Sequence, residues 1–149
     1  MAVQTTYNET MDAARVGQPV NTEWKNDISR TVEDAAGVGF GLPVAQGAND
    51  GGCKATENTD TEILGITVRE VSTDANDPDK FSQYMSARVR TKGVIWVVAA
   101  EGVAAGDPVY VTLATGAFGK TAGANILQIP NARWDSSASA DGLAKVRLG

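Results

Sequence analysis

The fold is decided by residues 92–115, KGVIWVVAAEGVAAGDPVYVTLAT. The run 93–98 is β-branched or aromatic at nearly every position after its first glycine, which is typical of a strand covered on both faces. After a turn at residues 101–102, the run 109–113 alternates apolar with polar or amphipathic residues. This alternation predicts a second strand with one face in a core and the other face exposed.

The same alternation recurs along the chain, which favours an all-β protein. Residues 64–68, 85–89 and 144–148 each place apolar side chains at every second position. A turn at residues 91–93 is predicted to fold the 85–90 strand back onto the 93–98 strand. A chain of 149 residues fits one domain. We therefore expect a compact antiparallel β-barrel or β-sandwich, and the sequence leaves the choice between the two open.

The N-terminal region differs from the rest. Residues 1–26 are polar and show no helical or strand period, so they form either a loose tail or an arm that becomes ordered against a partner. Their large apolar residues favour an extended N-terminal arm, with residues 27–149 as the β domain. The following stretch, residues 27–36, matches either a short helix capped by Asp27 and ended by Gly37 or an alternating strand. We prefer the strand because everything downstream is β.

A short motif, Gly-x-Pro-Val, occurs at residues 17–20, 41–44 and 106–109. Glycine permits a tight turn, and proline, which lacks an N–H group, is tolerated as the first residue of a strand or on a sheet edge. The motif therefore predicts three turns that lead into strands. The separations are too unequal for a solenoid repeat.

Composition excludes several classes of partner. The chain carries 18 acidic and 13 basic residues, a formal net charge of -5, without a basic cluster, which disfavours binding to nucleic acid. No apolar run is long enough to span a membrane, so no membrane partner is expected. The N-terminus has no signal-peptide pattern, and we expect the protein to be made and folded in a cytosol.

Chemistry is limited by the absence of histidine. Serine and cysteine triads and histidine-ligated metal sites are excluded, and the single cysteine, Cys53, is predicted to lie in a loop without a base to activate it. The acidic loop 72–80 lacks the glycine and closing glutamate of a calcium-binding EF-hand. We expect no catalytic residue, no cofactor and no metal.

Six segments, in order, resemble a known family along nearly the whole chain from about residue 28. They are residues 40–44 (FGLPV), 63–70 (ILGITVRE), 92–97 (KGVIWV), 103–110 (VAAGDPVY), 132–137 (ARWDSS) and 142–148 (GLAKVRL). The chain resembles the structural cement, or capsid decoration, proteins of tailed bacteriophages.

The resemblance implies a non-enzymatic virion protein. A protein of this family is expected to bind the outer surface of the head and to stabilise it by bridging subunits of the major capsid protein. The expected oligomer is a homodimer or a homotrimer. Large side chains in the arm could serve as anchors on such a partner, and the predicted contact residues are Tyr7, Met11, Arg15 and Trp24.

Two alternatives belong to other classes. Exposed tryptophans stack on sugar rings, so a glycan-binding β-sandwich adhesion module that uses Trp134 is the first. A structural component of the phage tail or baseplate is the second.

Overall fold

The computed structural model describes residues 3, 5–6, 14–71 and 74–149, and these residues form strands, bridges and turns without a helix. The all-β prediction is confirmed. The strands are β1 (Asn26–Val32), β2 (Val38–Gly39), β3 (Pro43–Gln46), β4 (Gly52–Ala55), β5 (Gly65–Thr67), β6 (Lys80–Phe81), β7 (Ser86–Val98), β8 (Pro108–Thr112), β9 (Ala117–Gly119), β10 (Ile126–Trp134) and β11 (Leu143–Leu148).

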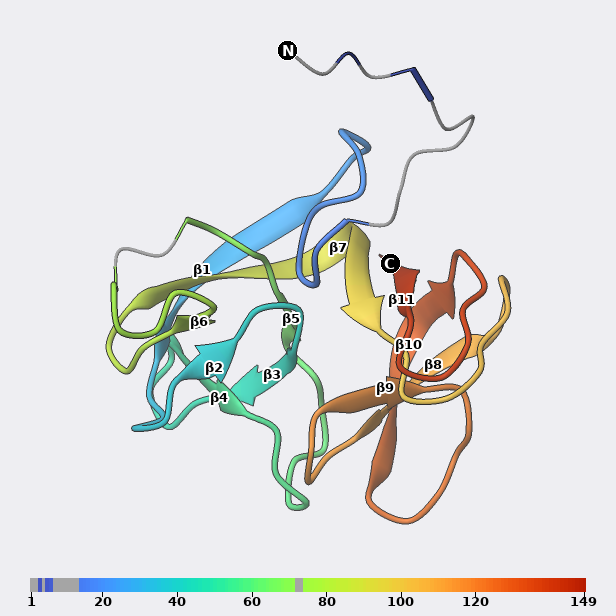
Figure 1. Cartoon of the computed structure of the whole chain (residues 1–149). Helices are drawn as coiled ribbons and strands as arrows, with labels where there is room; N and C mark the ends of the chain where they lie inside the picture. The colour runs from blue at the N-terminus through green and yellow to red at the C-terminus, as the bar shows by residue number, and fades with distance from the viewer. Residues whose placement is uncertain (1–2, 4, 7–13, 72–73) are drawn as a thin grey trace.

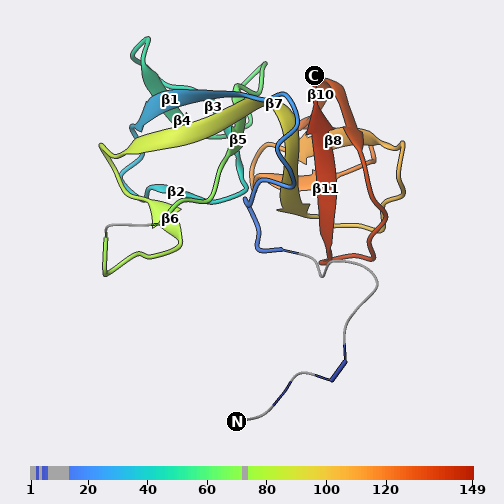
Figure 2. The same cartoon turned by 90° about the horizontal axis from the view of Figure 1, so that it is seen from above.

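The sheet closes on itself, so the fold is a β-barrel rather than a β-sandwich. Its strand order is β1-β4-β3-β5-β7-β11-β10-β8-β9, and β1 also pairs with β7, so β1, β4, β3, β5 and β7 form a closed ring. All pairings between strands are antiparallel except β1 with β4. Figures 1 and 2 show two lobes with β7 running through both. The first lobe holds β1 to β6 and the start of β7, and the second holds the end of β7 and β8 to β11.

The long strand β7 overturns one prediction. Residues 91–93 do not turn the chain back, because Ser86–Val98 is one continuous strand. Its first half pairs with β1 and β5 and its second half pairs with β11, so each half finds partners without folding onto the other. Gly93, at φ 115°, supplies a local conformation that other residues rarely adopt and so allows the change of direction between lobes.

Of the other local predictions, some are confirmed and one is wrong. Residues 26–32 form a strand, as preferred, and the helical alternative is wrong. Cys53 lies in β4 and is fully buried, so its assignment to a loop is wrong. All three Gly-x-Pro-Val turns are confirmed. Gly17, Gly41 and Gly106 have positive φ, and each following proline starts a strand or a bridge.

The second lobe repeats the topology of the first. Strands β1, β3, β4, β5 and the first half of β7 correspond to the second half of β7, β8, β9, β10 and β11. The parallel pairing of Val32 with Cys53 has its counterpart in the parallel bridge of Ala99 with Phe118. The small β2–β6 pair, Val38 with Phe81, corresponds to the bridge of Val103 with Ala138.

Several backbone hydrogen bonds of the first lobe have an equivalent in the second lobe. Each pair below joins equivalent positions at nearly the same N···O distance. Glu33 N to Cys53 O (3.0 Å) corresponds to Ala100 N to Phe118 O (2.8 Å), and Tyr84 N to Val32 O (2.8 Å) corresponds to Asp141 N to Ala99 O (2.7 Å). Thr67 N to Leu42 O (2.9 Å) corresponds to Trp134 N to Asp107 O (2.9 Å). Val68 N to Arg88 O (2.8 Å) corresponds to Asp135 N to Lys145 O (2.8 Å). Tyr84 and Asp141 even share a positive φ, 67° and 64°.

The sequence carries the same repeat. Residues 37–56 align without a gap on residues 102–121, with identical residues at seven positions. The identical pairs are Gly37/Gly102, Val38/Val103, Gly41/Gly106, Pro43/Pro108, Val44/Val109, Gly51/Gly116 and Thr56/Thr121. The chain is therefore an internal duplication of one β unit, with β7 shared between the copies.

Each lobe has its own hydrophobic core. The core of the first lobe centres on Val32, Val44, Cys53 and Val89, and the larger core around Trp134 lies mainly in the second lobe but includes Ile66 of β5. The C-terminal strand β11 lies between β7 and β10, as predicted for a strand that is paired inside the sheet. Ala144, Val146 and Leu148 of this strand point into the core.

Candidate functional site

Residues 17–20 of the N-terminal segment are attached to the body as an added strand. Gly17 N donates to Trp96 O at 2.7 Å, Trp96 N donates to Gln18 O at 3.1 Å, and Pro19 bridges Ile95. Gly17 O in turn accepts a bond of 2.7 Å from the amide of Arg69. The segment therefore links β7 to the chain that follows β5.

Two glycines make this attachment possible. Gly17 and Gly41 both have positive φ, and their backbones are so close that a Cβ atom on Gly17 would lie 2.7 Å from Gly41 N. A Cβ atom on Gly41 would meet Gly17 N at 2.6 Å. Any larger residue at either position would push the segment away from the body, because real Cβ atoms do not approach backbone so closely.

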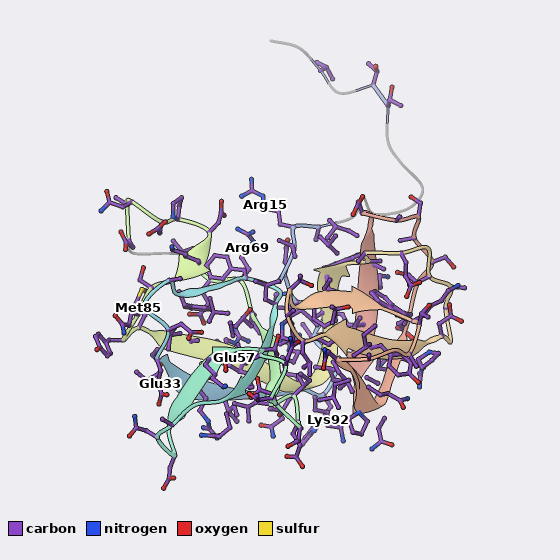
Figure 3. All side chains as sticks on the ribbon, turned by 90° about the horizontal axis from the view of Figure 1, so that it is seen from below. Arg15, Glu33, Glu57, Arg69, Met85 and Lys92 are labelled. Atoms are coloured by element: carbon purple, nitrogen blue, oxygen red, sulfur yellow. The ribbon has the colours of Figure 1, made fainter. Side chains whose placement is uncertain are left out.

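Arg15, a predicted contact residue, lies at one end of this segment in an open hollow of about 550 Å³. Arg69 and Asp79 also line it, joined by a bond of 2.8 Å between Arg69 Nη1 and Asp79 Oδ1. Val71, on its rim, is 96% exposed. Figure 3 labels both arginines near the junction of the lobes. The hollow joins two arginines to an exposed apolar side chain.

Trp24, a second predicted contact residue, lies at the other end of the segment and is 81% exposed. Its neighbour Glu23 accepts a hydrogen bond of 2.6 Å from Arg147 of β11, which lowers the pKa of the Glu23 carboxyl. Arg147 also holds Asp135 at 3.0 Å and lowers the pKa of that carboxyl. The chain next to Trp24 is thus tied to β11 while the indole itself faces solvent.

Tyr7 and Met11 lie outside the described residues, so the four predicted contact residues are not all located. Arg15 and Trp24 lie at opposite ends of the attached segment and do not form one cluster. Residues 17–20 pair with β7. The boundary at residue 26 between arm and domain stays a prediction.

The neck between the lobes contains a charged cluster that the sequence pattern did not reveal. The alternation of residues along β7 predicts that Arg90 points outward, yet its side chain is only 1% exposed. Its Nε donates to Asp27 Oδ1 at 2.8 Å, and its Nη1 donates to Val94 O at 2.7 Å across the bend in β7. Burial raises the pKa of Asp27, but hydrogen bonds from Arg90 and Arg88 outweigh this and lower it.

The described residues were searched for a metal site and for a reactive thiol. They contain no group of three or more His, Cys, Asp or Glu side chains that could hold a metal ion. Burial, together with the nearby Asp34 and Glu33, raises the pKa of Cys53 to about 11, so this thiol stays protonated at neutral pH. In the part of the chain that the structure describes, no helix has the length and apolarity to cross a membrane.

Trp134 is fully buried, and its Nε1 donates to Gly119 O at 3.1 Å. It cannot stack on a sugar, so a glycan site at Trp134 is wrong.

Comparison with known proteins identifies the family. The family model of the structural cement proteins (E217 gp24/Pam3 gp6) matches residues 3–149. The chain belongs to the structural cement protein family. This cement protein is therefore a structural, capsid-associated protein of a bacteriophage, and the resemblance found in the sequence is confirmed. No curated protein sequence matches the chain.

Two solved structures share the fold. A chain in the structure of the capsid of Myoviridae phage XM1 superposes with a TM-score of 0.77 at 20% identity, covering 100% of this cement protein and 98% of that chain. The head fibre gp8.5 N base of bacteriophage phi29 superposes with a TM-score of 0.52 at 14% identity, covering 85% and 95%. At such identities the likeness extends to the fold alone.

Proposed function

We propose that this cement protein binds the outer surface of the phage head and stabilises it by bridging neighbouring subunits of the major capsid protein. The family match over residues 3–149 carries the proposal. The net charge of -5 supports the outer surface, since an acidic protein is repelled by the packaged DNA.

The shape of the molecule supports bridging. Two lobes joined through one continuous strand offer two separate surfaces on a single molecule. The exposed Trp24 and the hollow around Arg15 add an aromatic side chain and an arginine, the residue types most often found as binding anchors. Assembly as a homodimer or homotrimer would multiply weak contacts on a repeating shell into strong attachment.

The test uses heads stripped of the cement protein and then loaded with it again. DNA release on heating is followed with an intercalating dye, and a folded but unrelated acidic protein serves as control. We expect reloaded heads to release DNA at a higher temperature than stripped heads. Equal release temperatures would refute the stabilising role. Sedimentation with heads and, separately, with tails distinguishes this function from a tail or baseplate role.

A further inference from the structure

The second half of β7 is paired along both edges. On one edge it pairs with β11, and on the other it carries residues 17–20 as an added antiparallel strand. Within this added strand, the bonds run from Gly17 N to Trp96 O at 2.7 Å and from Trp96 N to Gln18 O at 3.1 Å. This edge of the second lobe is thus occupied by an extended Gly-x-Pro-Val segment.

The equivalent edge of the first lobe belongs to β1. The matched hydrogen bonds place Val32 on Ala99, so Ser29 corresponds to Trp96. Thr31 N donates to Gly51 O on the β4 side, whereas Val32 N donates to Met85 O next to β7. Because backbone groups alternate in direction along a strand, the N–H and C=O groups of Ser29 point away from β7, as those of Thr31 do.

This edge has no strand along it at residues 26–30. Strand β4 pairs with β1 only at Thr31 and Val32, and among the described residues no other strand pairs with this side of β1. The side chain of Arg30 lies at this edge. Arg30 Nη1 donates to Ser29 O at 3.1 Å, while Arg30 Nε is buried without a hydrogen-bond partner. Arg30 therefore covers the carbonyl that, in the other lobe, accepts the amide of Gly17.

We propose that the open edge of β1, from Asn26 to Arg30, binds an extended segment of a capsid subunit as an added antiparallel strand. The inference rests on the proposed function. The duplicated lobe shows that an edge of this geometry accepts a short extended segment through main-chain bonds. Trp24, 81% exposed two residues before β1, offers an aromatic anchor at the end of the added strand.

Charge favours a capsid segment over a second copy of this chain. In an antiparallel pair of two β1 edges centred on Ser29, each Arg30 would lie opposite Ile28 of the other copy. The two Arg30 side chains would then be diagonal neighbours on one face, about 7–8 Å apart and within reach of each other, so their like charges would disfavour the pair. A capsid segment with a carboxylate at that position would pair with Arg30 instead. We therefore expect the bound segment to be extended and to carry an acidic residue facing Arg30.

The test compares Ser29→Pro with Ser29→Ala in binding to stripped heads. Proline removes an N–H group that points away from β7, and an edge position tolerates it, whereas alanine keeps that group. We expect Ser29→Pro to melt close to the wild type but to bind heads about tenfold more weakly, and Ser29→Ala to bind normally. Wild-type-like binding by folded Ser29→Pro would overturn the proposal.

Hydrogen exchange provides a second measurement that does not depend on the variant. Binding of the wild-type protein to heads should slow exchange in residues 26–30, and unchanged exchange would overturn the proposal. Normal head binding by Ser29→Pro with altered sedimentation of the free protein would also overturn it, because a second copy would then be the occupant. Failure of the wild-type protein to bind heads would instead refute the proposed function.

Discussion

The buried pair of Asp27 and Arg90 predicts a large effect of Asp27→Asn on stability. Arg90 is 1% exposed and the side chain of Asp27 is 11% exposed, so the asparagine variant would leave a buried guanidinium without its counter-charge. Removal of one partner from a buried ion pair costs about 3–5 kcal/mol. Arg88, also bonded to Asp27, is 33% exposed, which places the expected loss near the lower limit, about 3 kcal/mol.

The assay is reversible thermal unfolding at neutral pH, followed by circular dichroism. At about 2–4 °C per kcal/mol for a chain of this size, we expect Tm to fall by about 6–12 °C. Asp79→Asn is the matched control. Its bond to Arg69 is also 2.8 Å long, but the side chain of Asp79 is 76% exposed, so the loss should stay below about 1 kcal/mol.

Acid pH adds a second readout. Folding lowers the pKa of Asp27 below its ordinary value of 3.8, because hydrogen bonds from Arg90 and Arg88 outweigh the opposing effect of burial. The stabilisation is therefore complete well above pH 3.8 and is lost as the pH falls through the lower pKa of the folded state. The Tm difference between wild type and Asp27→Asn should shrink below pH 3.8. Equal losses for Asp27→Asn and Asp79→Asn at neutral pH would show that burial of the Asp27–Arg90 pair does not determine the loss of stability.

Three further predictions concern the N-terminal segment and the cores. Deletion of residues 1–20 should lower Tm relative to the full chain, because it removes the strand bonded to Trp96; an unchanged Tm would contradict this. Cys53 should resist a thiol reagent at pH 8 until the protein is unfolded, and fast modification of the folded protein would contradict its burial and raised pKa. Trp134→Ala should destabilise the protein by about 3–5 kcal/mol in denaturant unfolding, and a loss under 1 kcal/mol would contradict the burial of this side chain.

The sequence predicts individual strands better than their connections. Alternation in residues 109–113 and 144–148 correctly gave the buried faces of β8 and β11, because a half-buried strand leaves a period of two. The prediction of a turn at residues 91–93 was wrong because a glycine can allow a bend within a continuous strand as well as a turn that reverses the chain. Only the pairing of each half of β7 with different neighbours distinguishes the two.

The duplication could have been predicted from the sequence. Two of the three Gly-x-Pro-Val motifs, at residues 41–44 and 106–109, occupy equivalent positions in the two lobes, and the flanking residues extend the match. The third, at residues 17–20, belongs to the added strand and obscures the spacing. The buried state of Arg90 was not predictable, because alternation places it outward and its partner Asp27 is distant in sequence.

The most direct test of the bridging role is to image the head at a resolution that separates its subunits. We expect density for this cement protein on the outer surface, with each molecule in contact with at least two neighbouring major capsid subunits. Density on the inner surface, or contact with a single capsid subunit only, would contradict it.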